Sequence, residues 1–174
     1  MNILHINTNY NNSKIHHNIV SSMNDKSGIT GRVFLPVLKN DKASNEFVFV
    51  DKIRCLHKIE KILYFTRNHH LTKTAQKTYN INEFNTILAH SMFSNGLLAM
   101  TLSKKYNKSY SIIVTNTDMN IYLSKFPHLR KTGLKILLNA RKIFFSSSAY
   151  KIELLSKYVP EDMKRSINNK CAVI

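Results

Sequence analysis

The chain has 174 residues, 43% of them hydrophobic, and it carries 26 Lys and Arg against 10 Asp and Glu, for a net charge of +16. That length and composition suit one globular domain with a buried core and exclude a disordered chain. Its two cysteines, Cys55 and Cys171, exclude a disulfide framework and a Cys-x-x-Cys zinc motif, and no apolar run approaches the ~20 residues of a membrane-spanning helix.

Apolar residues repeat along the chain in a pattern that alternates between strands and helices. Strands are predicted over 2–7, 32–35, 47–50, 86–89, 110–115 and 142–146, with the start of a seventh at 171–174. Helices are predicted over 15–23, 52–66, 95–106, 134–140 and 149–158, with Pro36 closing the second strand and Ser94 capping the third helix. This order predicts an α/β fold, with a Rossmann-like parallel sheet of about six or seven strands and helices on both faces.

In an open parallel sheet, ligands bind beyond the carboxyl ends of the strands. Polar residues directly follow four of the predicted strands, so we expect their side chains to line one edge of the sheet. These residues are Thr8, Asn9, Tyr10 and the loop to Ser13 after the first strand, His90 after the fourth, Asn116, Thr117 and Asp118 after the fifth, and Ser146, Ser147 and Ser148 after the sixth.

Three of these positions have two interpretations each. His90 is either a hydrogen-bond donor or acid–base group for a ligand, or a loop histidine that bonds only to backbone. Asp118 either accepts a hydrogen bond from a ligand hydroxyl or caps the turn that follows it. The serine run around Ser147 either caps the next helix or presents a helix N-terminus to a phosphate.

The sequence gives little support for a metal site or a phosphate-binding glycine loop. Adjacent histidines, as at 16–17 and 69–70, point in different directions on a helix, and no acidic residue lies at a ligating spacing from them. We therefore expect no bound metal. Glycine occurs only at positions 28, 31, 96 and 133, which excludes a G-x-G-x-x-G fingerprint after the first strand and a Walker loop.

Five segments of the chain form a familiar set when their order and spacing are considered together. They are residues 1–6, 87–91 together with 95–99, 113–120, 140–151 and 170–174, and the second of them contains His90 and Ser91. The set resembles the N-terminal domain of the retaining bacterial glycosyltransferases of family four, which have the GT-B fold. Because the resemblance covers essentially the whole chain, it implies that 1–174 is a single acceptor-side domain. The C-terminal nucleotide-sugar domain of such enzymes is expected to lie outside this chain.

The resemblance also implies an activity and a role for each site residue. The full-length enzyme would transfer a sugar from a nucleoside-diphosphate sugar to a polysaccharide, glycan or lipid-linked acceptor with retention of configuration, without a metal or other cofactor. The isolated chain would be inactive. His90 matches the histidine that the family places beside the transferred sugar. The residues implied to bind acceptor or sugar are Thr8, Asn9, Tyr10, Asn116, Thr117, Asp118 and Ser147.

The chain departs from the family pattern at two places. The loop 8–13 has no glycine where many members have a Gly-Gly pair near the donor phosphate, so this loop is expected to face the acceptor. Asn116 occupies the position of the family's usual histidine.

The positive charge predicts an anionic partner. Residues 121–174 include eleven basic and three acidic residues, a net of +8. Such a surface attracts a lipid-diphosphate acceptor or the anionic inner face of a membrane, so at most peripheral membrane contact is expected. The two distant cysteines form no disulfide framework, which predicts a cytoplasmic protein. Two alternatives stay open: a basic surface that is merely solvated, and a basic α/β nucleic-acid-binding protein. No RNP, zinc-finger or helix-turn-helix motif supports the second, so nucleic acid is not expected as a partner.

Overall fold

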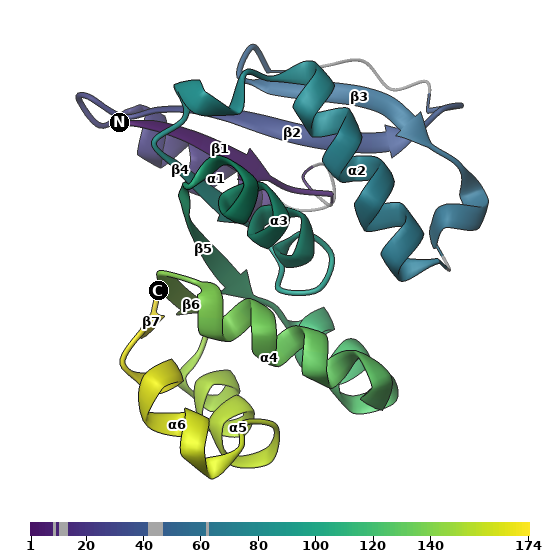
Figure 1. Ribbon diagram of the computed structural model, residues 1–174. Helices are drawn as coiled ribbons and strands as arrows, with labels where there is room; N and C mark the ends of the chain where they lie inside the picture. Colours follow the sequence, from purple (N-terminus) through teal and green to yellow (C-terminus); the bar gives the residue numbers. More distant parts are fainter. Residues whose placement is uncertain (9, 11–13, 42–46, 62) are drawn as a thin grey trace.

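The computed structural model describes residues 1–8, 10, 14–41, 47–61 and 63–174 (Figure 1). In this part of the chain seven strands form one sheet in the order β3-β2-β1-β4-β5-β6-β7, and every neighbouring pair is parallel. The strands are β1 (Asn2–Ile6), β2 (Thr30–Leu38), β3 (Val50–Leu56), β4 (Thr86–Ala89), β5 (Ser109–Val114), β6 (Lys142–Phe145) and β7 (Cys171–Val173). The predicted α/β class and parallel sheet are confirmed.

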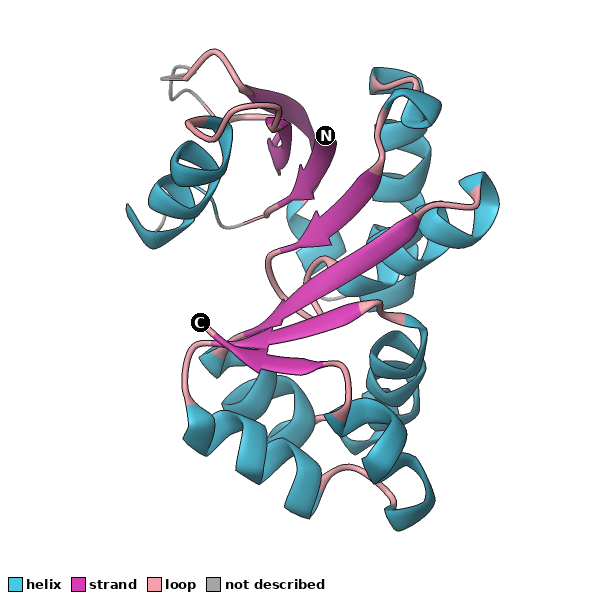
Figure 2. Ribbon diagram, turned by 90° about the vertical axis from the view of Figure 1, so that its left-hand side faces the viewer, coloured by secondary structure: helices cyan, strands magenta, loops and turns pink. Residues whose placement is uncertain are grey.

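Helices lie in most of the connections between strands and cover both faces of the sheet. They are α1 (Lys14–Asn24), α2 (Tyr64–Thr78), α3 (Gly96–Tyr106), α4 (Arg130–Asn139), α5 (Ser148–Lys157) and α6 (Glu161–Asn168). Shorter helical elements in the described residues include η2 (Lys58–Lys61), η3 (Ile81–Glu83), the π-helical η4 (Asp118–Leu123) and η5 (Pro127–Leu129). Figures 1 and 2 show α2, α3 and α4 on one face and α1 on the opposite face.

Buried residues on both faces of the sheet hold these layers together, because alternate side chains of a strand point to opposite faces. On the face of α2, α3 and α4 the main core contains Leu4, Ile6, Ile87, Ala89, Leu71, Leu98, Ile136 and Leu137. On the face of α1 a smaller cluster contains Ile3, Leu88 and Ile113, packed with Ile19 and Met23. Burial on both faces explains why the strands are nearly continuous apolar runs.

The prediction for residues 47–66 is wrong. A strand was expected over 47–50 and a helix over 52–66, but β3 covers Val50–Leu56 and α2 begins only at Tyr64. The apolar residues there are spaced three to four apart, as on a helix, while the backbone pairs with β2 along its whole length. The pairing depends on a strand distant in sequence, so tertiary context overrides the local periodicity.

β2 continues past Pro36, which was expected to close it. The pairing of β2 with β1 ends at Phe34, whereas its pairing with β3 continues to Leu38. Proline lacks the N–H that a ladder needs, and it is tolerated where one side of a strand has no partner. Pro36 lies in that one-sided stretch, so the strand can run through it.

Other predicted boundaries need smaller corrections. α3 begins at Gly96 with Asn95 as its N-cap residue, one position later than the cap expected at Ser94. α4 begins at Arg130, directly after η5, and not at residue 134. α6 was not predicted, although Glu161 follows a proline and opens the first turn, a typical start signal.

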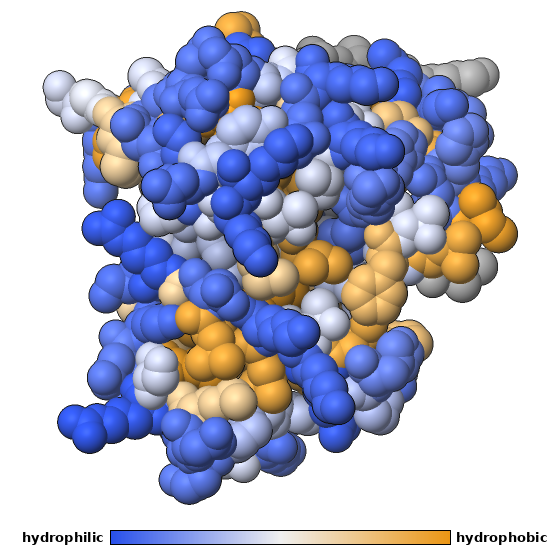
Figure 3. Space-filling view, in the orientation of Figure 1, coloured by the Kyte–Doolittle hydropathy of each residue, from blue (hydrophilic) through white to orange (hydrophobic). Residues whose placement is uncertain are grey.

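The surface seen in Figure 3 is mainly hydrophilic, with apolar side chains gathered at its right-hand side and around α4 and α6. Among the described residues, no helix is both long and apolar enough to cross a bilayer. The cysteines, Cys55 and Cys171, are both free thiols.

Candidate functional site

The carboxyl ends of β1, β4, β5 and β6 lie together at one edge of the sheet. The four strands are parallel, and the register aligns Ile6 with Ala89 and Val114 with Phe145. The residues that follow these strands therefore meet at this edge, as the sequence predicts. They are Thr8, Tyr10, His90, Asn116, Thr117, Asp118 and Ser147. Asn9 and the loop residues 11–13 lie outside the described residues.

At the centre of this edge His90 lies against a second histidine, His5 of β1. The Nδ1 atom of His5 is 3.0 Å from the Nε2 atom of His90, so one of the two nitrogens carries a hydrogen and donates a hydrogen bond to the other. Both rings are buried, with His90 only 1% exposed. The backbone N–H of His90 donates to the carbonyl of Ile6 at 3.0 Å. The rings are thus fixed relative to one another by the β1–β4 pairing.

Gly31 of β2 makes room for the His5 ring. A Cβ atom at position 31 would lie 2.8 Å from Nε2 of His5 and 3.0 Å from Oδ1 of Asn24. Such a contact is too close for a real side chain, so the ring fits only because residue 31 is glycine. The Nε2 atom of His5 and the Oδ1 atom of Asn24 are both buried without a hydrogen-bond partner.

Burial of His5 predicts a stability that depends on pH. Desolvation lowers the pKa of His5 from 6.5 to about 4. Between these values the unfolded chain binds a proton that the folded chain does not, so the folded state loses stability as the pH falls through this window. We expect the loss to reach about 3 kcal/mol, measured from urea unfolding curves at several pH values. His5→Phe should remove the part of the pH dependence of the unfolding free energy that comes from His5. An unchanged pH dependence in this variant would contradict the lowered pKa of His5.

Asp118 is fully buried and joins the two loops that flank the site. Its Oδ1 atom accepts from the hydroxyl of Ser91 at 2.8 Å and from the backbone N–H of Phe93 at 2.9 Å. Its Oδ2 atom accepts from the backbone N–H of Met92 and of Thr115, both at 2.9 Å, and from the Thr115 hydroxyl at 2.8 Å.

These bonds occupy both oxygens of the carboxylate. Desolvation raises the pKa of Asp118, and the hydrogen bonds from Phe93, Thr115, Met92 and Ser91 act in the opposite direction. The cap expected for Asp118 is on the turn that follows it, but all five bonds to the carboxylate come from residues 91–93 and from Thr115. The carboxylate ties the loop after β4, which carries His90, to the loop after β5, which carries Asn116.

Thr8 and Asn95 place two further polar groups at this edge. The backbone N–H of Thr8 donates to Oδ1 of Asn95 at 3.3 Å, which connects the end of β1 to the start of α3. The Thr8 hydroxyl and the Asn95 amide nitrogen are buried and have no partner within the protein. Buried polar atoms are rarely left unsatisfied, so these two atoms are suited to bind a ligand or water.

The remaining predicted residues differ in how available they are. The Tyr10 ring is buried, and its hydroxyl lies 3.0 Å from Nδ1 of His17 on α1. Ser147 is the N-cap of α5 and accepts from the N–H of Tyr150 at 3.3 Å, so its cap interpretation is confirmed. Asn116 and Thr117 are exposed, and the Asn116 amide donates to the Tyr150 hydroxyl.

One histidine of each adjacent pair has partners of another kind. His17 lies against Tyr10 and stacks on Phe47 with ring centroids 4.2 Å apart. His70 bonds to Glu60 through Nδ1 at 2.5 Å. Within the residues that the structure describes, no group of three or more His, Cys, Asp or Glu side chains is placed to hold a metal.

The sequence did not point to His5 or Asn95 as site residues. His5 is a polar residue inside an apolar strand, and Asn95 immediately precedes a helix. The position of His5 within an apolar run and the position of Asn95 before a helix can both be recognised in the sequence. Their meaning depends on partners, His90 and Thr8, that lie more than 80 residues away along the chain.

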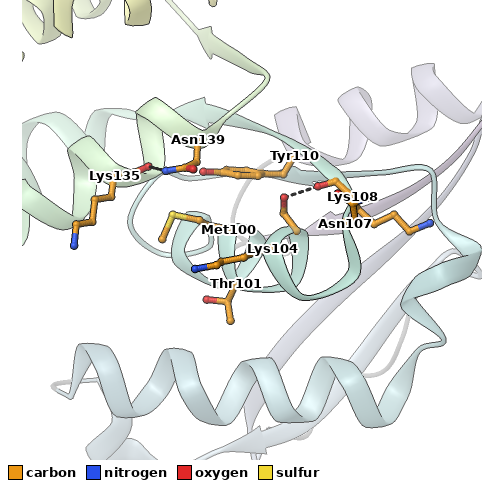
Figure 4. Close-up of a pocket in the computed structure, with 9 residues that line it drawn as sticks. Met100, Thr101, Lys104, Asn107, Lys108, Tyr110, Lys135 and Asn139 are labelled. Atoms are coloured by element: carbon orange, nitrogen blue, oxygen red, sulfur yellow. Dashed lines mark hydrogen bonds between the residues drawn. The ribbon is translucent and has the colours of Figure 1, made fainter. Parts of the chain in front are cut away.

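A groove of about 520 Å³ lies between α3 and α4, at the opposite edge of the sheet (Figure 4). It is lined by Met100, Thr101, Ser103, Lys104, Asn107, Lys108, Tyr110, Lys135 and Asn139. Of its lysines, Lys104 lies in the last turn of α3, where a cation stabilises the helix dipole, and Lys135 lies in the middle of α4. The groove is open at the amino end of β5, away from His90, and is not part of the candidate site.

No protein-family profile and no curated protein sequence matches the chain. Among solved structures it is similar to UDP-GlcNAc 2-epimerase from Neisseria meningitidis, determined with UDP-GlcNAc bound. The TM-score is 0.60 at 13% sequence identity, over 99% of this chain and 46% of the epimerase chain. At this identity the likeness concerns the fold alone, and membership of glycosyltransferase family four stays a prediction. The chain spans less than half of the epimerase and has the Rossmann-like fold of one half of a GT-B-like nucleotide-sugar enzyme.

Proposed function

We propose that residues 1–174 are the acceptor-side domain of a nucleotide-sugar-dependent glycosyltransferase. The enzyme would transfer a sugar, with retention of configuration, to a polysaccharide, glycan or lipid-linked acceptor. The donor domain would lie outside this chain, and the donor would be a nucleoside-diphosphate sugar, as the UDP-sugar of the similar epimerase suggests. The observation that carries the proposal is His90, fixed between His5 and the end of β4 at the edge where such sheets bind ligands.

His90 has the chemistry that the transfer requires. Departure of the diphosphate leaves positive character on the sugar, and retention requires the acceptor hydroxyl to attack from the face that the diphosphate leaves. A histidine held in a water-poor environment can donate a hydrogen bond to the sugar and stabilise developing charge, because both interactions are strong there. Since the His90 ring is buried, a ligand must displace the side chains that cover it.

The other residues would position the reacting groups. The Thr8 hydroxyl and the exposed Thr117 side chain are available for sugar or acceptor hydroxyls, and Asn9 is proposed with them from its place after β1. The exposed Asn116 amide would exchange its bond to the Tyr150 hydroxyl for one to the ligand. Tyr10, Ser147 and Asp118 would act by shaping the edge, since each is already bonded within the protein. No metal ligand enters this scheme.

The proposal is tested with the protein that carries residues 1–174 joined to its donor domain. We expect release of a nucleoside diphosphate from one nucleotide sugar that depends on an acceptor, with the anomeric configuration of the product retained by NMR. Formation of an epimer without transfer would overturn the proposed reaction. Salt-sensitive binding of the chain to DNA or RNA, with no transfer, would favour the nucleic-acid-binding alternative.

A further inference from the structure

Exposed apolar side chains gather where η2 and the start of α2 approach η4 and η5. Ile59, Leu63, Phe65, Ile121 and Phe126, here named the apolar rim, are each between 40% and 62% exposed. Figure 3 shows apolar groups along the right-hand side of the molecule, from the η2–α2 region towards the η4–η5 region. Isolated exposed apolar residues are ordinary, but a contiguous set marks a surface that contacts something.

Ring contacts make the two halves of the apolar rim continuous. Tyr64 lies 5.1 Å from Phe65 and 6.4 Å from Tyr122, measured between ring centroids. Tyr122 in turn lies 6.1 Å from Phe126 and stacks on the buried Phe93 at 5.0 Å. The exposed rings therefore pack on buried and half-buried aromatic rings. This packing already fixes their positions at the surface, so they lose little conformational freedom when they bind a partner.

The charges around the apolar rim have one sign. Lys58 and Lys125 directly adjoin rim residues in the sequence, Lys131 follows in the first turn of α4, and all three are exposed. The only acidic residue in 57–69 or 121–131 is Glu60, which is buried and bonded to the His57 N–H and to His70. An occupant of this surface must therefore accept apolar side chains in its interior and offer negative charge around them.

We propose that the apolar rim inserts into the interfacial layer of an anionic lipid bilayer. Aromatic and aliphatic side chains lower their free energy by entering that layer, while the flanking lysines remain among anionic headgroups. A second copy of the chain fits less well, because a symmetric contact would bring the same lysines face to face. The rim follows the carboxyl ends of β3 and β5, so it places the bilayer on the side of the molecule where His90 lies.

Vesicle sedimentation of the 174-residue chain tests this surface. We expect binding to phosphatidylcholine vesicles that contain phosphatidylglycerol and little binding to phosphatidylcholine alone. Phe65→Ser with Phe126→Ser should weaken the partition by about tenfold or more. Lys58→Glu with Lys125→Glu should weaken it by a similar factor and reduce its salt dependence.

Two controls change exposed residues elsewhere on the surface. Ile152→Ser alters a 66% exposed isoleucine on α5, and Lys104→Glu alters an exposed lysine on α3, and neither should change the partition. Circular dichroism confirms the fold of each variant.

Unchanged vesicle binding by the folded Phe65/Phe126 variant overturns the proposal. Dimerisation or salt-sensitive RNA binding that this variant abolishes, without an effect on vesicles, would instead assign the surface to a second copy or to nucleic acid. The measurement involves no sugar transfer, so it stands or fails independently of the proposed reaction.

Discussion

Replacing Asp118 by Asn should lower the free energy of unfolding by about 3 kcal/mol or more. The carboxylate accepts five hydrogen bonds, two through Oδ1 and three through Oδ2, and is 0% exposed. An amide has one oxygen, so its NH₂ group must face either the Phe93 N–H or the N–H groups of Met92 and Thr115. Each orientation leaves buried donors without an acceptor, and the desolvation cost of those donors is then unopposed. Urea unfolding monitored by circular dichroism measures the change.

Asp162→Asn is the control, because it removes the same charge from an exposed position in the first turn of α6. Its effect should stay within about 0.5 kcal/mol. If the Asp118 and Asp162 variants unfold at the same urea concentration, Asp118 does not hold the two loops together. The loss of stability should also loosen the segment 91–93, which amide hydrogen exchange reports separately.

The fold could be predicted wherever the strand pattern is local. β1, β4, β5 and β6 are short apolar runs that end at polar residues, and their parallel order follows from the helices between them. β3 could not be predicted in this way, because its residues have helical spacing and become a strand only by pairing with β2. The long helix α2 is strongly polar, so periodicity gave no sign of it beyond residue 66.

The site could be predicted as a set of positions but not as a set of bonds. The rule that ligands bind beyond strand ends selects His90 and Asp118 from the sequence alone. It does not show that Asp118 turns towards residues 91–93, or that Tyr10 turns towards His17, because those directions depend on packing between distant segments. His5 was missed for the same reason, since its partner is 85 residues away.

In the enzyme that contains this chain and a donor domain, His90→Gln should lower kcat by about 10²–10⁴-fold. The Michaelis constant for the nucleotide sugar should change little, since the donor domain binds the nucleotide. Glutamine keeps a hydrogen-bonding side chain of similar length but lacks the imidazole ring that lies against His5. His5→Phe should give a smaller loss and a shifted pH–rate profile, because His5 would act only by fixing the position and tautomer of His90.

His69→Gln is the matched control, an exposed histidine on α2 that should leave the rate unchanged. If His90→Gln folds and transfers sugar at the normal rate, His90 is structural and the edge acts only by positioning its ligands. If His90→Gln and His5→Phe lower kcat by the same large factor, His90 and His5 act as a unit. His90 would then owe its effect to a proton shared with His5, because two residues that act independently would give different losses.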